Sequence, residues 1–411
     1  MRNFKTYILS FVLSVLAVLP AAAQDSLSVV SDTLDVEASA LDSLRISIIT
    51  CTPGKDIYAK FGHTALRVVD YTLHKDAVFN YGCFNYNSDN FLFKFLLGQT
   101  DYLLEAEEFE YFMYRYSMMG NGVSEQVLNL TQQEANKLLT LLLENLRPEN
   151  QEYRYNWLYD NCTERARDII EKAVDGEVVY TKEERQITVR QMLRDCLKEC
   201  KWDEFGVDMI LGSEIDKNAD KRIQMFIPAY YSSEADKAII VRKDGTIVPL
   251  VSETCNVIQE SFVDEETNYF ISPIFVFTLL AIVSGVLLSA FGIGTKKKRE
   301  FIWFDAILHL LQGLAGIIVA FLFFFSEHPA VDSNWLVIIF NPIPLFYSGW
   351  LIYCKIRNKR NILAYVNLAV MLGFSVAMMA VPQSFNPAMY LLVLALLLRA
   401  ASQVYFVRLK K

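Results

Sequence analysis

The sequence has little of what metal sites and disulfide frameworks require. It contains four histidines and seven cysteines in 411 residues, and no two cysteines form a C-x-x-C pair. A structural zinc site needs clustered Cys and His ligands, and a disulfide-stapled domain pairs an even number of cysteines. The sequence therefore favours neither kind of framework, and we expect no metal ion.

An excess of basic residues is also absent. The chain has 39 Lys and Arg against 47 Asp and Glu, a formal net charge of −8, and most of the acidic residues precede residue 269. A nucleic-acid-binding surface is basic, so this class of partner is excluded for the first part of the chain. No glycine-rich phosphate loop is present, and we expect no nucleotide and no other cofactor.

The amino terminus predicts a secretory signal peptide over residues 1–23. Two basic residues precede an apolar core at 7–19, and three alanines at 21–23 form a small-residue cleavage site. An uncleaved anchor is the alternative. No cysteine follows the site directly, so the mature chain is not itself expected to be a lipoprotein. Residues 24–43 are acidic, serine-rich and free of aromatics, which indicates a flexible linker.

Long apolar runs follow only after residue 269. Each of the five has about the 20 residues that a bilayer core requires. We therefore predict a five-helix transmembrane domain at 270–411, preceded by an exported domain at 44–269. The runs are residues 270–293, 301–325, 335–354, 362–381 and 388–407.

Basic residues in this region occupy alternate loops. Four follow the first run, four the third and three the last, whereas the loops at 326–334 and 382–387 have none. Because cytoplasmic loops carry the excess of Lys and Arg, the carboxyl terminus is predicted to be cytoplasmic. Five spans then place the exported domain in the periplasm, above the inner membrane, as the signal peptide also predicts.

The exported domain reads as an α+β fold. Residues 131–146 predict a helix, because a Thr-x-x-Glu capping box precedes a leucine stripe. The segment 206–216 is rich in turn residues and has no role that the sequence reveals. Strands are predicted at 44–51, 63–69, 77–86, 238–242 and 246–251.

A cysteine stands where a second helix is predicted to begin. In YDNCTERARDII, Cys162 follows Asp160 and Asn161, either of which can cap a helix, and apolar residues then recur at helical spacing. The positive end of the helix dipole lowers the pKa of such a thiol and favours the thiolate. Packing in the core is the simpler alternative, since free cysteine is among the most buried residue types.

A thiolate nucleophile usually has a histidine as its base, and the exported domain has two histidines. His63 starts a strand, from which its side chain can reach a helix N-terminus, although a core histidine is the alternative. His74 lies in a polar turn beside Lys75, where exposure is expected. A third polar group should orient the imidazole, and Asn80 on the neighbouring strand is the candidate, with His74 competing for that role.

Two motifs resemble a known fold. FGHTALRV, followed by YRYNWLYDNCTERARDII, resembles the permuted NlpC/P60-like, papain-like cysteine fold, in which a strand histidine precedes a cysteine that opens a helix. The wider pattern resembles the Lnb family of lipoprotein N-acyltransferases. It comprises NYGCFNYNSDNFLFKFLLGQTDYLL, GVDMILGSEIDK, FIPAY and the multi-span tail.

The resemblance implies transfer of an acyl chain from a membrane phospholipid to the α-amine of the lipidated N-terminal cysteine of a diacylated lipoprotein. On the matching positions it implies Cys162 as the nucleophile, through a thioester, and His63 as the base. The motif does not settle the third member, so Asn80 remains a candidate.

Further residues are expected around this pair. The helix N-terminus and Asn161 are expected to receive the oxyanion. Tyr153 and Tyr155 are expected to line the approach, with packing as the alternative. His328, in the outer loop, is expected to position a lipid head group or the substrate amine, or only to cap a span.

Ionisable residues inside the apolar runs need an explanation, because they are costly in a bilayer. Asp305 and Arg399 are expected to form a structural pair, and His309 has no assigned role. The proline-rich NPIP at 341–344 breaks the third run. We expect a kink there that a neighbouring helix fills, in preference to an acyl-chain cavity.

Two other functions are the alternatives to acyl transfer. The first is a membrane-anchored cell-wall amidase or peptidase with the same Cys–His pair. The second is a non-catalytic envelope protein whose spans bind a partner. Five spans are more than an amidase needs, which favours acyl transfer.

Overall fold

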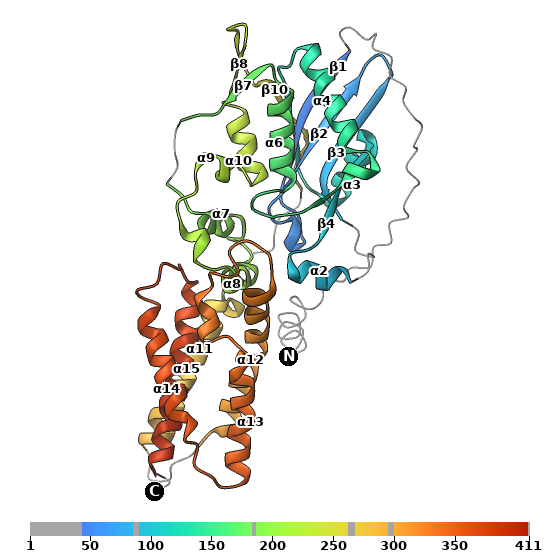
Figure 1. The fold of residues 1–411 in the computed structure, drawn as a ribbon. Helices are drawn as coiled ribbons and strands as arrows, with labels where there is room; N and C mark the ends of the chain where they lie inside the picture. Colours follow the sequence, from blue (N-terminus) through green and yellow to red (C-terminus); the bar gives the residue numbers. More distant parts are fainter. Residues whose placement is uncertain (1–42, 85–89, 183–185, 262–267, 295–299, 410–411) are drawn as a thin grey trace. The chain divides into compact units, whose positions relative to one another are not determined.

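The computed structural model describes residues 43–84, 90–182, 186–261, 268–294 and 300–409. The predicted signal peptide and, except for Ser43, the predicted linker lie outside these residues. A mixed α and β part is followed by a helical part (Figure 1). This confirms the α+β exported domain and the helical carboxyl-terminal domain that the sequence predicts.

A seven-stranded antiparallel sheet organises the exported domain, with the strand order β10-β5-β1-β2-β3-β4-β6. Three further short strands form a second sheet in the order β7-β8-β9. The strands of the large sheet are β1 (Leu44–Cys51), β2 (His63–Asp70), β3 (Lys75–Cys83), β4 (Asp101–Glu108), β5 (Val123–Leu128), β6 (Glu152–Arg154) and β10 (Val251–Ile258). Those of the small sheet are β7 (Gly176–Val179), β8 (Ile239–Arg242) and β9 (Ile247–Pro249).

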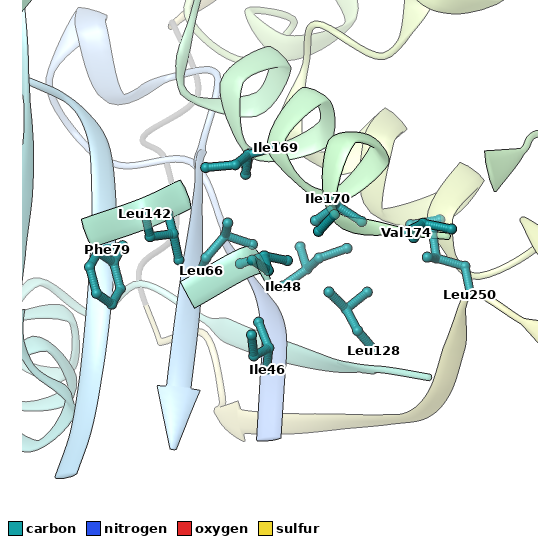
Figure 2. Close-up of a cluster of buried hydrophobic side chains, with 14 of the residues drawn as sticks. Ile46, Ile48, Leu66, Phe79, Leu128, Leu142, Ile169, Ile170, Val174 and Leu250 are labelled. Atoms are coloured by element: carbon teal, nitrogen blue, oxygen red, sulfur yellow. The ribbon is translucent and has the colours of Figure 1, made fainter. Parts of the chain in front are cut away.

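Helices α4 (Gln132–Asn145) and α6 (Cys162–Ala173) pack on one face of the large sheet (Figure 1). Alternate residues of the strands point to this face, so Ile48 of β1 and Leu66 of β2 are fully buried there. Figure 2 shows them in one cluster with Leu142 of α4 and Ile169 of α6. Burying each such side chain contributes about 1.5–3 kcal/mol.

Helix α3 (Phe109–Met119) packs on the other face. The strand residues between those of the first cluster point here, and Ile49, Cys51 and Val78 are buried with Phe112 of α3. The remaining helices of the exported domain are α2 (Phe91–Leu97), α5 (Pro148–Gln151), α7 (Val189–Cys196), α8 (Lys201–Ile210), α9 (Lys221–Gln224) and α10 (Pro228–Ala235), with 3₁₀ turns η1 (Ile57–Ala59) and η2 (Ser213–Asp216).

Most of the predicted elements of this domain are present. The capping box forms, since Thr131 Oγ1 accepts from the Glu134 N–H at 3.2 Å and Glu134 Oε2 accepts from the Thr131 N–H at 2.8 Å. The strand predicted at 246–251 is present as β9, but it ends at Pro249, and Val251 already belongs to β10. Proline has no N–H to give to a strand ladder, which separates the two.

Within the described residues of the helical part, three helices are long and apolar enough to cross a membrane, and two shorter helices are also apolar. The long candidates are Ile302–Phe325, Trp335–Ile356 and Pro387–Leu409. That all five predicted runs cross the bilayer stays a prediction. The elements are η3 (Tyr269–Ile271), α11 (Pro273–Leu288), η4 (Ser289–Ile293), α12 (Ile302–Phe325), η5 (Trp335–Ile338), α13 (Ile343–Ile356), α14 (Leu363–Ala377) and α15 (Pro387–Leu409).

The NPIP segment interrupts the third run between η5 and α13. Two glycines of α12 pack directly on the break. A Cβ on Gly316 would lie 2.3 Å from the Asn341 nitrogen, and one on Gly313 would lie 2.4 Å from the Leu345 nitrogen. The neighbouring helix therefore fills the kink, as expected.

The predicted ion pair between spans is present. Arg399 Nε donates to Asp305 Oδ1 at 2.6 Å, and both side chains are buried. His309, on the same helix as Asp305, bonds to Gln312 and Gln403. These contacts tie α12 to α15, so they serve the packing of the helical part.

The segment 206–216 turns out to join the two domains. The Gly212 N–H donates to the Ala330 carbonyl at 2.6 Å, and the Ser213 N–H donates to the Ser333 carbonyl at 3.1 Å. A Cβ on Gly212 would lie 2.2 Å from the Ser333 carbonyl carbon, so only glycine permits this approach. Asn334 Nδ2 also donates to the Met209 carbonyl at 2.8 Å. The loop after α12 is thus fixed to the exported domain.

Candidate active site

Cys162 is the first residue of α6, as the sequence predicts. Asn161 caps the helix, and its Oδ1 accepts from the N–H groups of Thr163 at 2.8 Å and Glu164 at 3.1 Å. The thiol is half-buried, and its sulfur lies 3.9 Å from the Thr163 hydroxyl. The cap therefore holds the thiol at the positive end of the helix dipole.

His63 and Asn80 lie together beside this thiol. His63 starts β2, and its Nε2 is 3.1 Å from Asn80 Oδ1 on β3. The imidazole and the Cys162 thiol interact electrostatically, since each shifts the pKa of the other. The structure thus brings together the three residues that were predicted as nucleophile, base and third member.

Two residues that the sequence analysis missed continue this arrangement. Asn80 Nδ2 donates to Glu107 Oε1 at 3.0 Å, and Arg115 of α3 forms an ion pair with the same carboxylate. Glu107 stands in the run EAEEFEY, where its charge alone would indicate a solvent-exposed strand face. The sequence did contain one indication that Glu107 is covered. The helix that follows it, α3, is largely apolar and must therefore pack on that face of the strand.

The charges of Cys162 and His63 stabilise each other and shift both pKa values. Burial raises the pKa of the Cys162 thiol, but the His63 charge and the hydrogen bonds from His63, the Thr64 backbone and Thr163 outweigh burial and lower the pKa below its ordinary value. Burial lowers the pKa of His63, but the Cys162 charge and the hydrogen bonds to Cys162 and Asn80 outweigh it and raise the pKa. Both shifts favour a thiolate beside an imidazolium.

Tyr153 and Tyr155 lie near the thiol, and whether they line a substrate approach stays a prediction. Gly82 of β3 has φ +88°, and a Cβ there would lie 3.5 Å from Cys162 Cβ, 3.8 Å from Tyr155 Cε2 and 3.9 Å from the Tyr153 hydroxyl. This backbone conformation favours glycine, and the three distances are ordinary van der Waals contacts. The buried Tyr153 hydroxyl has no hydrogen-bond partner among the described residues. Arg165 stacks 3.5 Å above the Tyr153 ring.

The side chains of Asn161 and His328 both form hydrogen bonds to backbone carbonyls, and the roles expected for these residues stay predictions. The side-chain N–H groups of Asn161 donate to the carbonyls of Trp157 at 3.0 Å and Phe226 at 2.9 Å, so the side-chain amide of this residue is already used in these two bonds. His328 bonds to the Phe95 carbonyl, with Nε2 at 2.7 Å, and its contact is with α2.

His74, the competing residue, lies exposed in the turn between β2 and β3 with φ 51°. His63 starts β2 at the other end of this hairpin. A strand of eight residues spans roughly 25 Å, which separates His74 from Cys162. Among the described residues, no group of three His, Cys, Asp or Glu is placed to hold a metal ion.

The domain arrangement and the site together define a class. The chain is an envelope membrane protein in which an exported α+β domain with a cysteine–histidine pair precedes a helical membrane domain. The exported part matches the family model of the Lnb N-terminal periplasmic domain over residues 32–195, and the helical part matches that of the Lnb transmembrane domain over residues 264–411. The chain therefore belongs to the Lnb family. No curated protein and no solved structure matches it significantly.

Proposed function

We propose that this protein is a lipoprotein N-acyltransferase that uses Cys162 as its nucleophile. The observation that carries the proposal is the placement of Cys162 at the first position of α6, together with His63 held by Asn80. The lowered pKa of Cys162 and the raised pKa of His63 agree with it. Membership of the Lnb family and the membrane domain support a substrate that resides in the membrane.

In the first half-reaction, the Cys162 thiolate attacks the carbonyl carbon of a phospholipid ester. A carbon–sulfur bond forms, and the ester carbon–oxygen bond breaks. The His63 imidazolium gives its proton to the leaving alkoxide, which departs as a lysophospholipid. The acyl chain is left as a thioester on Cys162.

In the second half-reaction, the α-amine of a diacylated lipoprotein attacks the thioester carbon. A carbon–nitrogen bond forms, the carbon–sulfur bond breaks, and neutral His63 takes the amine proton. The pair returns to thiolate and imidazolium. Asn80 holds the ring in place through both steps.

Each step passes through an oxyanion that needs hydrogen-bond donors. Asn161 Oδ1 accepts from Thr163 and Glu164, which leaves the backbone N–H of Cys162 as the first-turn donor that this cap does not use. The Tyr153 hydroxyl is the second donor in this proposal, because it is buried near Gly82 without a partner among the described residues.

The proposal places the exported domain in the periplasm and the five apolar runs across the inner membrane. The close contact between Gly212 and Ser333, which connects the exported domain to the loop after α12, supports a fixed height of the site above the bilayer. A membrane-anchored amidase would need the same Cys–His pair, but it would not need a fixed connection of this kind.

Mass spectrometry of lipoprotein N-termini in a deletion strain tests the function. Lipoproteins should lose the N-linked acyl chain, regain it with the parent gene, and remain without it when Cys162→Ala is supplied. Unchanged N-acylation in the deletion strain, together with altered cell-wall peptides, would favour the amidase instead.

A further inference from the structure

The short helix α2 exposes an unusually apolar surface. Its sequence is FLFKFLL, and none of its seven residues is buried. Leu92, Phe93 and Phe95 are 43%, 55% and 41% exposed. Contiguous apolar surface of this kind is unfavourable in water and marks a site of interaction.

This helix is fixed against one end of α12, a candidate membrane span. The Leu97 carbonyl accepts from the Glu327 N–H at 2.8 Å, and the Phe95 carbonyl accepts from His328 Nε2 at 2.7 Å. Gly98 ends α2 with φ +70°, and a Cβ there would lie 2.7 Å from the His328 nitrogen.

The same end of α12 is itself apolar and exposed. The Phe93 ring of α2 lies 6.1 Å from the Phe321 ring of α12, measured between centroids. Phe324 and Phe325, at the last turn of α12, are 66% and 65% exposed. The apolar surface of α2 is therefore continuous with that of a candidate membrane span.

A row of aromatic rings leads from α2 toward the thiol. The Phe95 ring lies 6.2 Å from Phe91, and Phe91 lies 5.6 Å from Phe84 in a stacked arrangement. Phe84 then lies 5.1 Å from Tyr102, and Tyr102 lies 4.0 Å from Tyr155. Tyr155 and Cys162 both lie beside Gly82, since a Cβ there would be 3.8 Å from Tyr155 Cε2 and 3.5 Å from Cys162 Cβ.

We propose that α2 lies in the interfacial layer of the membrane, and that the acyl chain of a lipid leaves the bilayer along this row of rings to reach Cys162. Amphipathic segments with Phe and Leu on one face bury that face at the headgroup boundary. An acyl chain that leaves the bilayer needs a continuous apolar surface, because each exposed methylene is unfavourable in water. The inference that the acyl chain reaches Cys162 rests on the proposed function, whereas the inference that α2 contacts lipid does not.

Photo-crosslinking tests the lipid contact without any activity. A benzophenone amino acid is placed at Phe93, at Phe324 and at Tyr114, and the full chain is irradiated in nanodiscs of phosphatidylethanolamine and phosphatidylglycerol. Tyr114 is the matched control, since it is 64% exposed on α3. We expect lipid adducts at 93 and 324 and none at 114. Adducts at 324 without any at 93, or adducts at 93 to a lipoprotein alone, would overturn the membrane contact.

Acylation of Cys162 tests the route. Phe93→Ser combined with Leu92→Ser should lower the rate of acylation by limiting phospholipid about tenfold or more. Iodoacetamide labelling of Cys162 should not change, because the pair itself is intact. Tyr114→Ser combined with Met118→Ser, on α3, should leave acylation unaltered. An unchanged acylation rate in the α2 variant would overturn the route.

The two proposals fail in different ways. A parent chain that is never acylated at Cys162 contradicts the proposed function and the route with it. Lipid adducts at position 93 would still support the membrane contact of α2 in that case.

Discussion

Asn80 fixes which nitrogen of His63 carries a proton. Its Oδ1 lies 3.1 Å from His63 Nε2, while its Nδ2 donates to Glu107 Oε1 at 3.0 Å. Because a carboxylate only accepts, the amide must turn its nitrogen to Glu107 and its oxygen to His63. His63 Nε2 must then donate, so in the neutral ring Nδ1 is the nitrogen that can take the thiol proton. The ion pair with Arg115 holds Glu107 in place.

This relationship makes Glu107 a positioning residue. Glu107→Ala should lower the rate of acyl transfer by up to about a hundredfold, because a small displacement of the base is costly. It should also shift the acidic limb of the pH–rate profile. Glu107→Gln keeps an oxygen that can accept from Asn80, so it should retain most of the activity. Equal losses in both variants, with an unmoved profile, would mean that Glu107 only stabilises the fold.

The pH dependence of Cys162 alkylation separates the two histidines. The pKa of Cys162 is lowered by His63, so iodoacetamide should react well below the usual thiol pKa of about 8.5. His63→Ala removes the lowering and leaves burial, which raises the pKa, so the curve should move to alkaline pH.

His74→Ala is the matched control, because that residue is exposed in a distant turn. Its curve should overlay that of the parent, as measured by mass spectrometry of the Cys162 peptide. A shift in the His74 variant with none in the His63 variant would transfer the base role to His74.

A buried carboxyl next to the site should make stability depend on pH. Burial raises the pKa of Glu164 from 4.5 to about 7, although Arg167 partly offsets it, and Glu164 Oε2 has no partner among the described residues. The folded pKa lies above the unfolded one, so this stabilisation is present below pH 4.5 and is lost as pH rises to about 7.

Glu164→Gln should remove this dependence. Its melting temperature should exceed that of the parent at pH 8, and the gap should close at pH 5. A Gln side chain can still accept from the Asn161 N–H, so the start of α6 is retained. A gap that is constant across this range would contradict the raised pKa.

Topology is tested with reporter fusions. The alternation of basic loops predicts that a fusion at Lys297 reports the cytoplasm and one at Asp332 reports the periplasm. A fusion at the carboxyl terminus should agree with Lys297. If Lys297 and Asp332 report the same side, the five-span arrangement is wrong.

Local patterns predicted much of this fold. The strands at 44–51 and 63–69, the capped helix at 132–145 and the helix that Cys162 opens each carry their own signal within a few residues. Their alternation, caps and leucine spacing depend on short-range geometry alone.

The sequence did not predict those elements and contacts whose partners lie far away along the chain. The strands β4, β5 and β6 were not predicted, because their pairing joins segments that are far apart in the chain. Glu107 is 27 residues from Asn80, and its charge resembled that of a solvated strand. Gly212 received no role for the same reason, since its partners Ala330 and Ser333 follow more than a hundred residues later.

The central claim is a thioester on Cys162, and the direct measurement is peptide mass spectrometry of the full chain in phospholipid nanodiscs without an acceptor. We expect an acyl adduct on the Cys162 peptide that neutral hydroxylamine removes. Addition of a diacylglyceryl-cysteinyl peptide should discharge the adduct as the N-acylated peptide appears at a matching rate, and Cys162→Ala should form neither. N-acylated product from Cys162→Ala at the parent's rate, with no adduct in the parent, would contradict the account.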